Sequence, residues 1–146
     1  MDKRKIYDRR IKEIIEGEKV LSILLIGAGA KIKEKDFNTL KDIDLFVITD
    51  ENYGFQREII EIEDVLFDIS YMSLNAFNKA IDDELTFLIN ALQSYRIVYS
   101  ELEELEEFLY RIISIYNKGP QNLTTNDVNY IRFKLYQDYE DISFRM

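Results

Sequence analysis

Three short apolar runs in the first half of the chain constrain its fold more than any other feature of the sequence. They cover residues 20–26, 43–48 and 65–71. Each has the length of one strand, and the first two are apolar at nearly every position, which is typical of strands buried on both faces. In the third run the apolar side chains alternate onto one face. The sequence therefore predicts a small sheet that contains these three strands.

Two further segments before residue 73 belong to the same unit. Isoleucines at positions 6, 11, 14 and 15 have helical spacing, and Gly17 is a plausible end for that helix. Residues 57–62 alternate, and Glu63-Asp64 could turn the chain so that this segment forms a hairpin with residues 65–71, although Glu-Asp is not a favoured two-residue turn.

After Ser73 the pattern is helical to the end of the chain. We expect helices near 74–80 and 82–93, a short extended connector over 96–99 and an amphipathic helix over 102–116 that ends at Gly119-Pro120. Thr124 or Thr125 would cap a last helix. The predicted fold class is α+β: a small mixed sheet with flanking helices in residues 1–73, followed by a helical C-terminal region in residues 74–146 that packs on this core.

Composition narrows the chemistry that is open to the chain. The 146 residues include no cysteine and no histidine, which excludes disulfides, thiol nucleophiles, zinc sites built on those residues and histidine-based catalysis. Acid–base or metal chemistry would therefore depend on carboxylates, whose hard oxygen atoms select Mg²⁺, Mn²⁺ or Ca²⁺.

Charge and hydropathy indicate the expected partners. The formal net charge is −9, which argues against a broad nucleic-acid-binding face. Lysines 31, 33, 35 and 41 nevertheless cluster after a glycine turn and could form a local basic rim for a phosphate. The longest apolar run, residues 20–30, is too short to span a bilayer, and no signal peptide is visible, so we expect a cytoplasmic protein that does not enter the membrane.

Asp42, Asp44 and Asp68 interrupt otherwise apolar strands. Alternation places Asp42 and Asp44 on the same side of the second strand, where two carboxylates repel one another unless a cation or solvent lies between them. If the third strand lies beside the second, Asp68 joins them. Three carboxylates on adjacent strands are the ligands with which two Mg²⁺ ions hold a triphosphate for in-line attack.

Each of these features also has an ordinary structural interpretation. An Asp-x-Asp at the start of a strand is often a solvated strand end, and Asp68 could belong to the polar face of a half-exposed strand. Residues 27–30, Gly-Ala-Gly-Ala, could be only a tight turn. Their order and phasing together favour a functional site: strand, glycine turn, Asp-x-Asp entering a strand, and a lone aspartate inside a third strand.

This order resembles that of the polymerase-β-like nucleotidyltransferase superfamily, especially its small bacterial and antibiotic-modifying members. The family pattern is a strand that ends in Gly-Ser, a loop, an Asp-x-Asp flanked by apolar residues, and a third aspartate on a later strand. The matching segments are Leu-Leu-Ile-Gly-Ala at 24–28, Asp-Ile-Asp-Leu-Phe-Val at 42–47 and Phe-Asp-Ile at 67–69. The resemblance covers residues 20–72 and is most specific over residues 42–47.

The resemblance implies a set of roles for individual residues. Asp42 and Asp44 would bind Mg²⁺ or Mn²⁺, and Asp68 would complete the metal site and help to deprotonate a hydroxyl acceptor. The backbone of the turn at Gly27 and Ala28 would hold the distal phosphates of a nucleoside triphosphate (NTP). Lys31 or Lys33 could add positive charge there.

Two residues depart from the family pattern. Ala28 stands where the family places serine, so a hydroxyl donor to phosphate is lost; such a hydrogen bond to a charged group contributes about 1.5–3 kcal/mol. Lys41 replaces the usual small hydroxyl residue before the first aspartate, and the loop over 28–41 is longer than usual. The three aspartates are intact.

The sequence therefore leaves several functions open. The first is a metal-dependent enzyme that transfers a nucleoside monophosphate from an NTP to a hydroxyl of a small molecule or protein. The second is a binding module of the same fold without turnover, including an antitoxin-like protein that acts on a partner toxin. A purely structural domain is a third, and an antibiotic-modifying enzyme is a special case of the first. Besides the NTP and a hydroxyl acceptor, the expected partners are a second copy of the chain or a partner protein.

Overall fold

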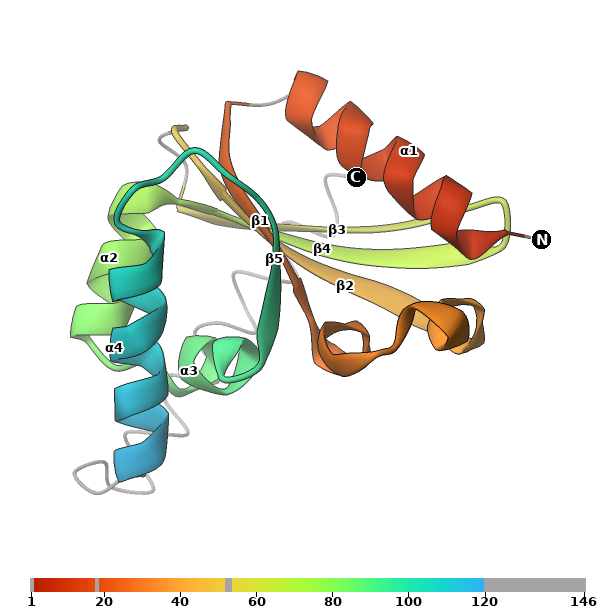
Figure 1. Ribbon diagram of the computed structural model, residues 1–146. Helices are drawn as coiled ribbons and strands as arrows, with labels where there is room; N and C mark the ends of the chain where they lie inside the picture. Colours follow the sequence, from red (N-terminus) through yellow and green to blue (C-terminus); the bar gives the residue numbers. More distant parts are fainter. Residues whose placement is uncertain (1, 18, 52–53, 120–146) are drawn as a thin grey trace.

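A five-stranded mixed sheet with helices on both faces forms the centre of the computed structural model (Figure 1). The structure describes residues 2–17, 19–51 and 54–119. The elements follow in the order α1 (Lys3–Gly17), β1 (Val20–Ile26), η1 (Gly27–Lys31), η2 (Glu34–Thr39), β2 (Asp42–Thr49), β3 (Phe55–Ile62), β4 (Val65–Ser73), α2 (Leu74–Asp82), α3 (Thr86–Leu92), β5 (Tyr95–Ser100) and α4 (Leu105–Lys118). The predicted α+β core with a mixed sheet and flanking helices is therefore confirmed, whereas the predicted last helix lies outside the described residues.

The strand order is β3-β4-β2-β1-β5. β2 and β4 run parallel and occupy the centre with β1, while the remaining neighbours pair antiparallel. The predicted hairpin is present: Ile62 pairs with Val65, and both turn residues, Glu63 and Asp64, adopt positive φ angles of 50° and 68°. Positive φ at both positions is the turn geometry that matches the twist of paired strands. The turn therefore forms although neither residue is glycine.

Alternation along the central strands divides the core into two layers. Ile43, Leu45 and Val47 of β2 pack in one cluster with α1, whereas Phe46 and Ile48 pack in a second cluster with α2, α3 and α4. These two clusters lie on opposite faces of the sheet because successive side chains of a strand point to opposite sides. The helices hold the sheet between them, with α1 on one face and α2 to α4 on the other (Figure 1).

Residues 96–99, which we expected to be a connector, belong to an edge strand of the sheet. β5 pairs antiparallel with β1, and the hydroxyls of Ser22 and Ser100 are 2.9 Å apart across this pair. β5 therefore continues the sheet from the C-terminal side of the proposed boundary at residue 73. The division of the chain at that residue stays a prediction.

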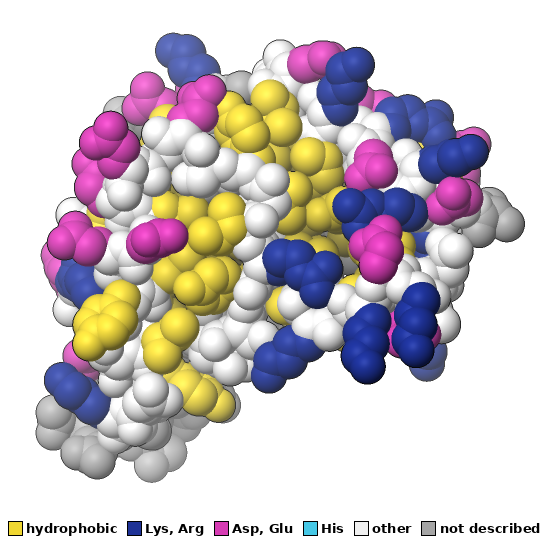
Figure 2. All heavy atoms as spheres, in the orientation of Figure 1, with side chains coloured by type: hydrophobic (Ala, Val, Ile, Leu, Met, Phe, Trp, Pro, Cys, Tyr) yellow, Lys and Arg dark blue, Asp and Glu magenta, His cyan; other side chains and the backbone are white. Residues whose placement is uncertain are grey.

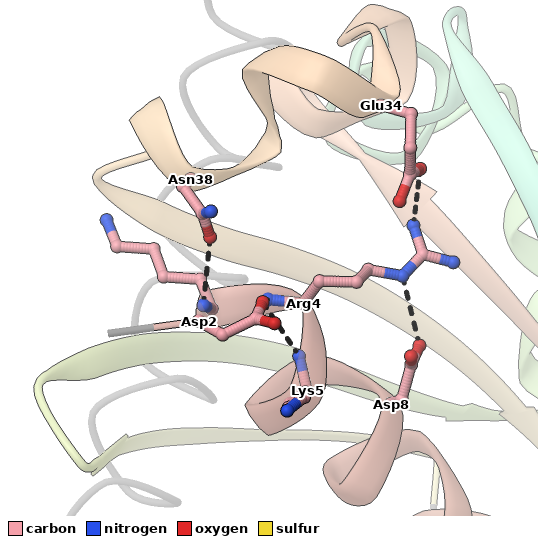
Figure 3. A network of polar contacts seen from close by, with 7 residues as sticks. Asp2, Arg4, Lys5, Asp8, Glu34 and Asn38 are labelled. Atoms are coloured by element: carbon pink, nitrogen blue, oxygen red, sulfur yellow. Dashed lines mark hydrogen bonds and ion pairs between the residues drawn. The ribbon is translucent and has the colours of Figure 1, made fainter.

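The segment that leads into β2 is anchored on the start of α1. Asp2 caps this helix by accepting hydrogen bonds from the backbone N–H groups of Arg4 and Lys5. Arg4 forms an ion pair with Glu34 at 2.8 Å, and the backbone N–H of Lys3 donates to Asn38 Oδ1 at 2.9 Å (Figure 3). These contacts fix η2, and with it the entry of the chain into β2.

No helix in the described ranges has both the length and the apolar character needed to cross a bilayer.

Candidate functional site

The three predicted aspartates share one face and one end of the sheet. β2 and β4 pair in a register that sets Asp44 beside Asp68, and Asp42 lies two residues before Asp44. All three have the parity of Phe46, Ile48 and Met72, the side chains that pack under the α2–α4 layer. Those apolar residues occupy the C-terminal halves of the strands, and the aspartates occupy the N-terminal halves. The condition on which the three-aspartate site depended, that the second and third predicted strands are neighbours, is therefore met.

Asp44 is the most perturbed acid at this end of the sheet. Burial is the main cause that raises its pKa from 3.8 to about 6, and the negative charges of Asp42 and Asp68 raise it further, while Arg57 lowers it. Desolvation and like charges both disfavour the ionised form of a carboxyl group. The fold therefore holds Asp44 in a position where a nearby cation would stabilise its charged form.

Arg57 is a participant that the sequence analysis did not identify. Its Nε donates to Asp68 Oδ1 at 2.6 Å, and its Nη2 contacts Asp68 Oδ2, so the guanidinium holds both carboxylate oxygens. Both side chains are about three-quarters buried, with 24% of each exposed. Such a two-pronged ion pair is strong and directional. In this arrangement Asp68 has a guanidinium as its counter-charge.

Gly27 brings the backbone against Asp44. It begins η1 with a φ of +66°, and a β-carbon at this position would lie 2.5 Å from Asp44 Oδ2. Ile26, the residue before it, is the register partner of Asp44 across β1 and β2. The turn that the sequence predicted is thus a short 3₁₀ helix, and glycine is required at its first position by both conformation and space.

A pocket of about 310 Å³ opens beside Gly27 and Asp44. Its walls come from the end of β1, from η1, from β2, and from the end of α3 with its connection to β5. The lining residues are Ile26, Gly27, Lys31, Asp44, Asn90, Ala91, Gln93 and Ser94. Three predicted site residues, Gly27, Lys31 and Asp44, therefore meet at one cavity.

The other predicted residues lie outside this lining. Ala28 is exposed on η1, and Asp42 is exposed at the start of β2. Asp68, on β4, is bound by the guanidinium of Arg57 from β3. Asn90, Gln93 and Ser94 were missed, because polar residues in a helical segment look like an ordinary solvated face. Only their position beside β1 distinguishes these residues from ordinary surface residues. That position depends on the pairing of β5 with β1.

The segment between β1 and β2 is rich in lysine, and one of these lysines, Lys31, lines the pocket. Lys31, Lys33, Lys35 and Lys41 are all exposed on the segment between β1 and β2. Figure 2 shows dark blue side chains gathered over the part of the surface where η1 and η2 lie in Figure 1. Arg96 of β5 fixes this segment by donating from Nη2 to the Ile32 carbonyl at 2.7 Å. A basic rim of this kind favours the approach of an anion.

The donor set fits a divalent cation only in part. Asp42 and Asp44 offer carboxylate oxygens on one face, as Mg²⁺ requires. Within the ranges that the structure describes, however, no three acidic side chains are arranged to hold a metal ion. Both oxygens of Asp68 contact the guanidinium of Arg57, which would compete with a cation for them.

Comparison with known proteins bears on the fold. No protein-family model matches the chain, and no curated protein matches it in sequence. Among solved structures, the fold is similar to the crystal structure of a nucleotidyltransferase-like protein from Exiguobacterium sibiricum 255-15, with a TM-score of 0.53 and 13% sequence identity. The match covers 75% of this chain and 37% of that protein, so this chain spans little more than a third of its length. The chain therefore has the nucleotidyltransferase-like fold that the sequence resemblance predicted.

Proposed function

We propose that this protein binds an NTP together with Mg²⁺ or Mn²⁺ and transfers its nucleoside monophosphate to a hydroxyl acceptor. The observation that carries the proposal is the position of Asp44. This carboxyl group lies beside Asp42 on its own strand, opposite Asp68 on the parallel strand and against Gly27 at the wall of the pocket. A cation that enters together with the phosphate group would lie beside Asp44. Burial and like charges already disfavour the ionised form of this carboxyl group, and the cation would stabilise it.

Asp42 and Asp44 are the residues that would hold the cation. A divalent cation bound there would neutralise the charge of the phosphate oxygens during transfer. The two side chains project from the same face of β2. The apolar residues of β2 belong to the core clusters on both faces of the sheet, and this packing holds the strand in place. Asp44 would then remain ionised at neutral pH, because an adjacent positive charge offsets the effects that raise its pKa.

The phosphates would lie between η1 and the aspartates. Gly27 has no side chain, so its backbone can approach a phosphate closely, and Lys31 lines the same pocket from the end of η1. In the transfer, the acceptor oxygen attacks the α-phosphorus, the bond from that phosphorus to the bridging oxygen breaks, and pyrophosphate leaves. Asp68 would accept the acceptor's proton, which requires Arg57 to release one of its two oxygens.

The first experiment measures nucleotide binding. Calorimetric titration of non-hydrolysable analogues of the four NTPs, with Mg²⁺ or Mn²⁺, should show metal-dependent binding to the wild type. Binding should be lost in Asp42→Asn/Asp44→Asn. Asp50→Asn is the matched control, because Asp50 is exposed just after the other end of β2. Absence of binding for every NTP and both metals would refute the proposal.

A binding module without turnover is the second candidate, and the Arg57–Asp68 ion pair favours it. A carboxylate whose two oxygens both accept from a guanidinium is a weaker base and a weaker metal ligand than a free one. Ala28 also lacks the hydroxyl that the family pattern offers to phosphate. In this case the protein would bind a nucleotide or a partner protein, and the antitoxin-like role would belong to this class.

Label transfer distinguishes the two candidates. The protein is incubated with each α-labelled NTP and Mg²⁺, alone and with a panel of hydroxyl acceptors that includes aminoglycosides. An enzyme will move the label onto an acceptor or onto its own side chains, and Asp42→Asn/Asp44→Asn will abolish this. A binding module will instead retain the nucleotide, which is recovered intact as NTP.

A further inference from the structure

One wall of the pocket is neutral and polar, and neither the sequence resemblance nor the fold comparison assigns it a role. Asn90 lies in the last turn of α3, Gln93 follows at its C-cap, and Ser94 leads into β5. We infer that this wall binds the nucleoside part of the bound nucleotide. The side chains of Asn90 and Gln93 would form hydrogen bonds with the base and so set the preference among the four bases. The inference rests on the proposed function, because it concerns the same nucleotide.

Charge separates the pocket into two ends. Lys31 and Asp44 lie on the side formed by η1 and β2, whereas Asn90, Gln93 and Ser94 are uncharged. A triphosphate with its cation belongs at the charged end. The part of the nucleotide that carries no charge is therefore the part that fits against α3.

The side chains of this wall suit a base or a ribose. Each carboxamide presents an acceptor oxygen and a donor nitrogen side by side, which is the pattern that pairs with the edge of a nucleobase. Within the described part of the chain, Asn90 and Gln93 make no side-chain hydrogen bond, and both are exposed to the pocket side of the surface. Ile26 and Ala91 add apolar surface to the same cavity, against which a flat ring can pack.

The volume agrees with this assignment. About 310 Å³ is at the lower end of the range for small-molecule sites, which is enough for one nucleoside group but leaves no room for a macromolecule. The nucleoside would thus lie in an open cleft between the end of β1 and the end of α3. The triphosphate would extend along η1 toward the exposed lysines.

The test compares the four NTPs with inorganic tripolyphosphate, a probe that lacks the nucleoside. Each is titrated with Mg²⁺ into wild-type protein, Asn90→Ala, Gln93→Ala and the double variant. Loss of one neutral hydrogen bond should weaken binding of the preferred NTP by roughly threefold to tenfold. The ratio of affinities between preferred and other NTPs should fall toward one in the double variant, while tripolyphosphate binds all forms equally.

Matched controls exist on other elements. Gln56→Ala removes an exposed glutamine from β3 at the opposite edge of the sheet, and Asn78→Ala removes an exposed asparagine from α2. Neither should change any affinity. All four positions are exposed, so the variants are expected to fold.

Each alternative result has one meaning. Unchanged NTP affinities and base preference in Asn90→Ala/Gln93→Ala would overturn the inference while nucleotide binding, and with it the proposed function, stands. A parallel loss of tripolyphosphate binding would also overturn it, because the wall would then hold phosphate. Failure of the wild type to bind any NTP would instead refute the proposed function itself.

Discussion

Gly27 and Asp44 are packed so closely that a β-carbon on Gly27 would lie 2.5 Å from Asp44 Oδ2. This contact follows from the register in which Ile26 pairs with Asp44, since the next residue must turn away from the strand at that point. The turn has a φ of +66°, which glycine adopts without strain. Two requirements, space and conformation, therefore fall on one residue beside the most perturbed carboxyl group of the site.

Gly27→Ala should destabilise the protein more than backbone strain alone explains. Gly54→Ala is the matched control, because Gly54 has a similar φ of +75° and a β-carbon there would meet no atom within 4 Å. Strain at Gly54 should lower the free energy of unfolding by about 1–2 kcal/mol. Gly27→Ala should cost at least about 1 kcal/mol more, since Asp44 must move. Urea denaturation of both variants measures the difference.

The clash itself can be isolated in a double-mutant cycle. In an Asp44→Ala background the contacting carboxylate is absent, so Gly27→Ala should cost only what Gly54→Ala costs. Equal costs of Gly27→Ala in both backgrounds would show that Asp44 does not restrict this position.

The ion pair between Arg57 and Asp68 should contribute measurably to stability. Both side chains are largely buried, and removal of one partner leaves the other charge without its counter-charge. The coupling free energy from Arg57→Gln, Asp68→Asn and the double variant should be about 1–2 kcal/mol. The exposed pair Arg111–Asp82 should give less than about 1 kcal/mol in the same cycle.

Arg57 should also oppose cation binding. Its charge lies beside the carboxylates that would hold Mg²⁺, and its guanidinium holds both oxygens of Asp68. Arg57→Gln should therefore tighten metal-dependent NTP binding, by roughly tenfold for a removed charge close to the site. Arg111→Gln should have no effect. Weaker binding in Arg57→Gln would instead make Arg57 a ligand of the phosphates.

The raised pKa of Asp44 predicts a defined pH dependence. Because the folded-state pKa is about 6 and the unfolded value is 3.8, ionisation of Asp44 penalises the folded state. The protonated form of Asp44 favours the folded state. This contribution to stability is fully present below pH 4 and is lost as the pH rises through 6. Asp44→Asn should therefore have nearly wild-type stability at pH 3.5 and exceed it by about 3 kcal/mol above pH 7. Denaturation curves from pH 3.5 to 8 measure this, and a constant difference across the range would contradict it.

Much of the central sheet could be predicted because its signals are local. Each buried strand is an apolar run, and an aspartate inside such a run, as at Asp68, stands out without knowledge of its neighbours. The common face of Asp42 and Asp44 follows from alternation alone. The match of Asp44 with Asp68 required only that the second and third strands be adjacent.

The features that were missed depend on contacts between distant segments. β5 resembles a connector in the sequence because its edge position leaves every one of its side chains at least partly exposed, and only pairing with β1 makes it a strand. Arg57 meets Asp68 through the register of a hairpin whose turn has no glycine. Asn90 and Gln93 reach the pocket because α3 ends beside β1. None of these pairings has a signature within its own segment.

Ala28→Ser tests whether the turn of η1 faces the phosphates. Ala28 is exposed and follows Gly27 directly, so a serine can be placed there without disturbing the core. If phosphates lie along η1, the added hydroxyl will donate to a charged oxygen and tighten metal-dependent NTP binding by about tenfold, equivalent to roughly 1.4 kcal/mol. The gain should vanish in the Asp42→Asn/Asp44→Asn background, where the cation is not held. An unchanged affinity in Ala28→Ser, with binding otherwise intact, would place the phosphates away from η1 and make Lys31 a solvated side chain.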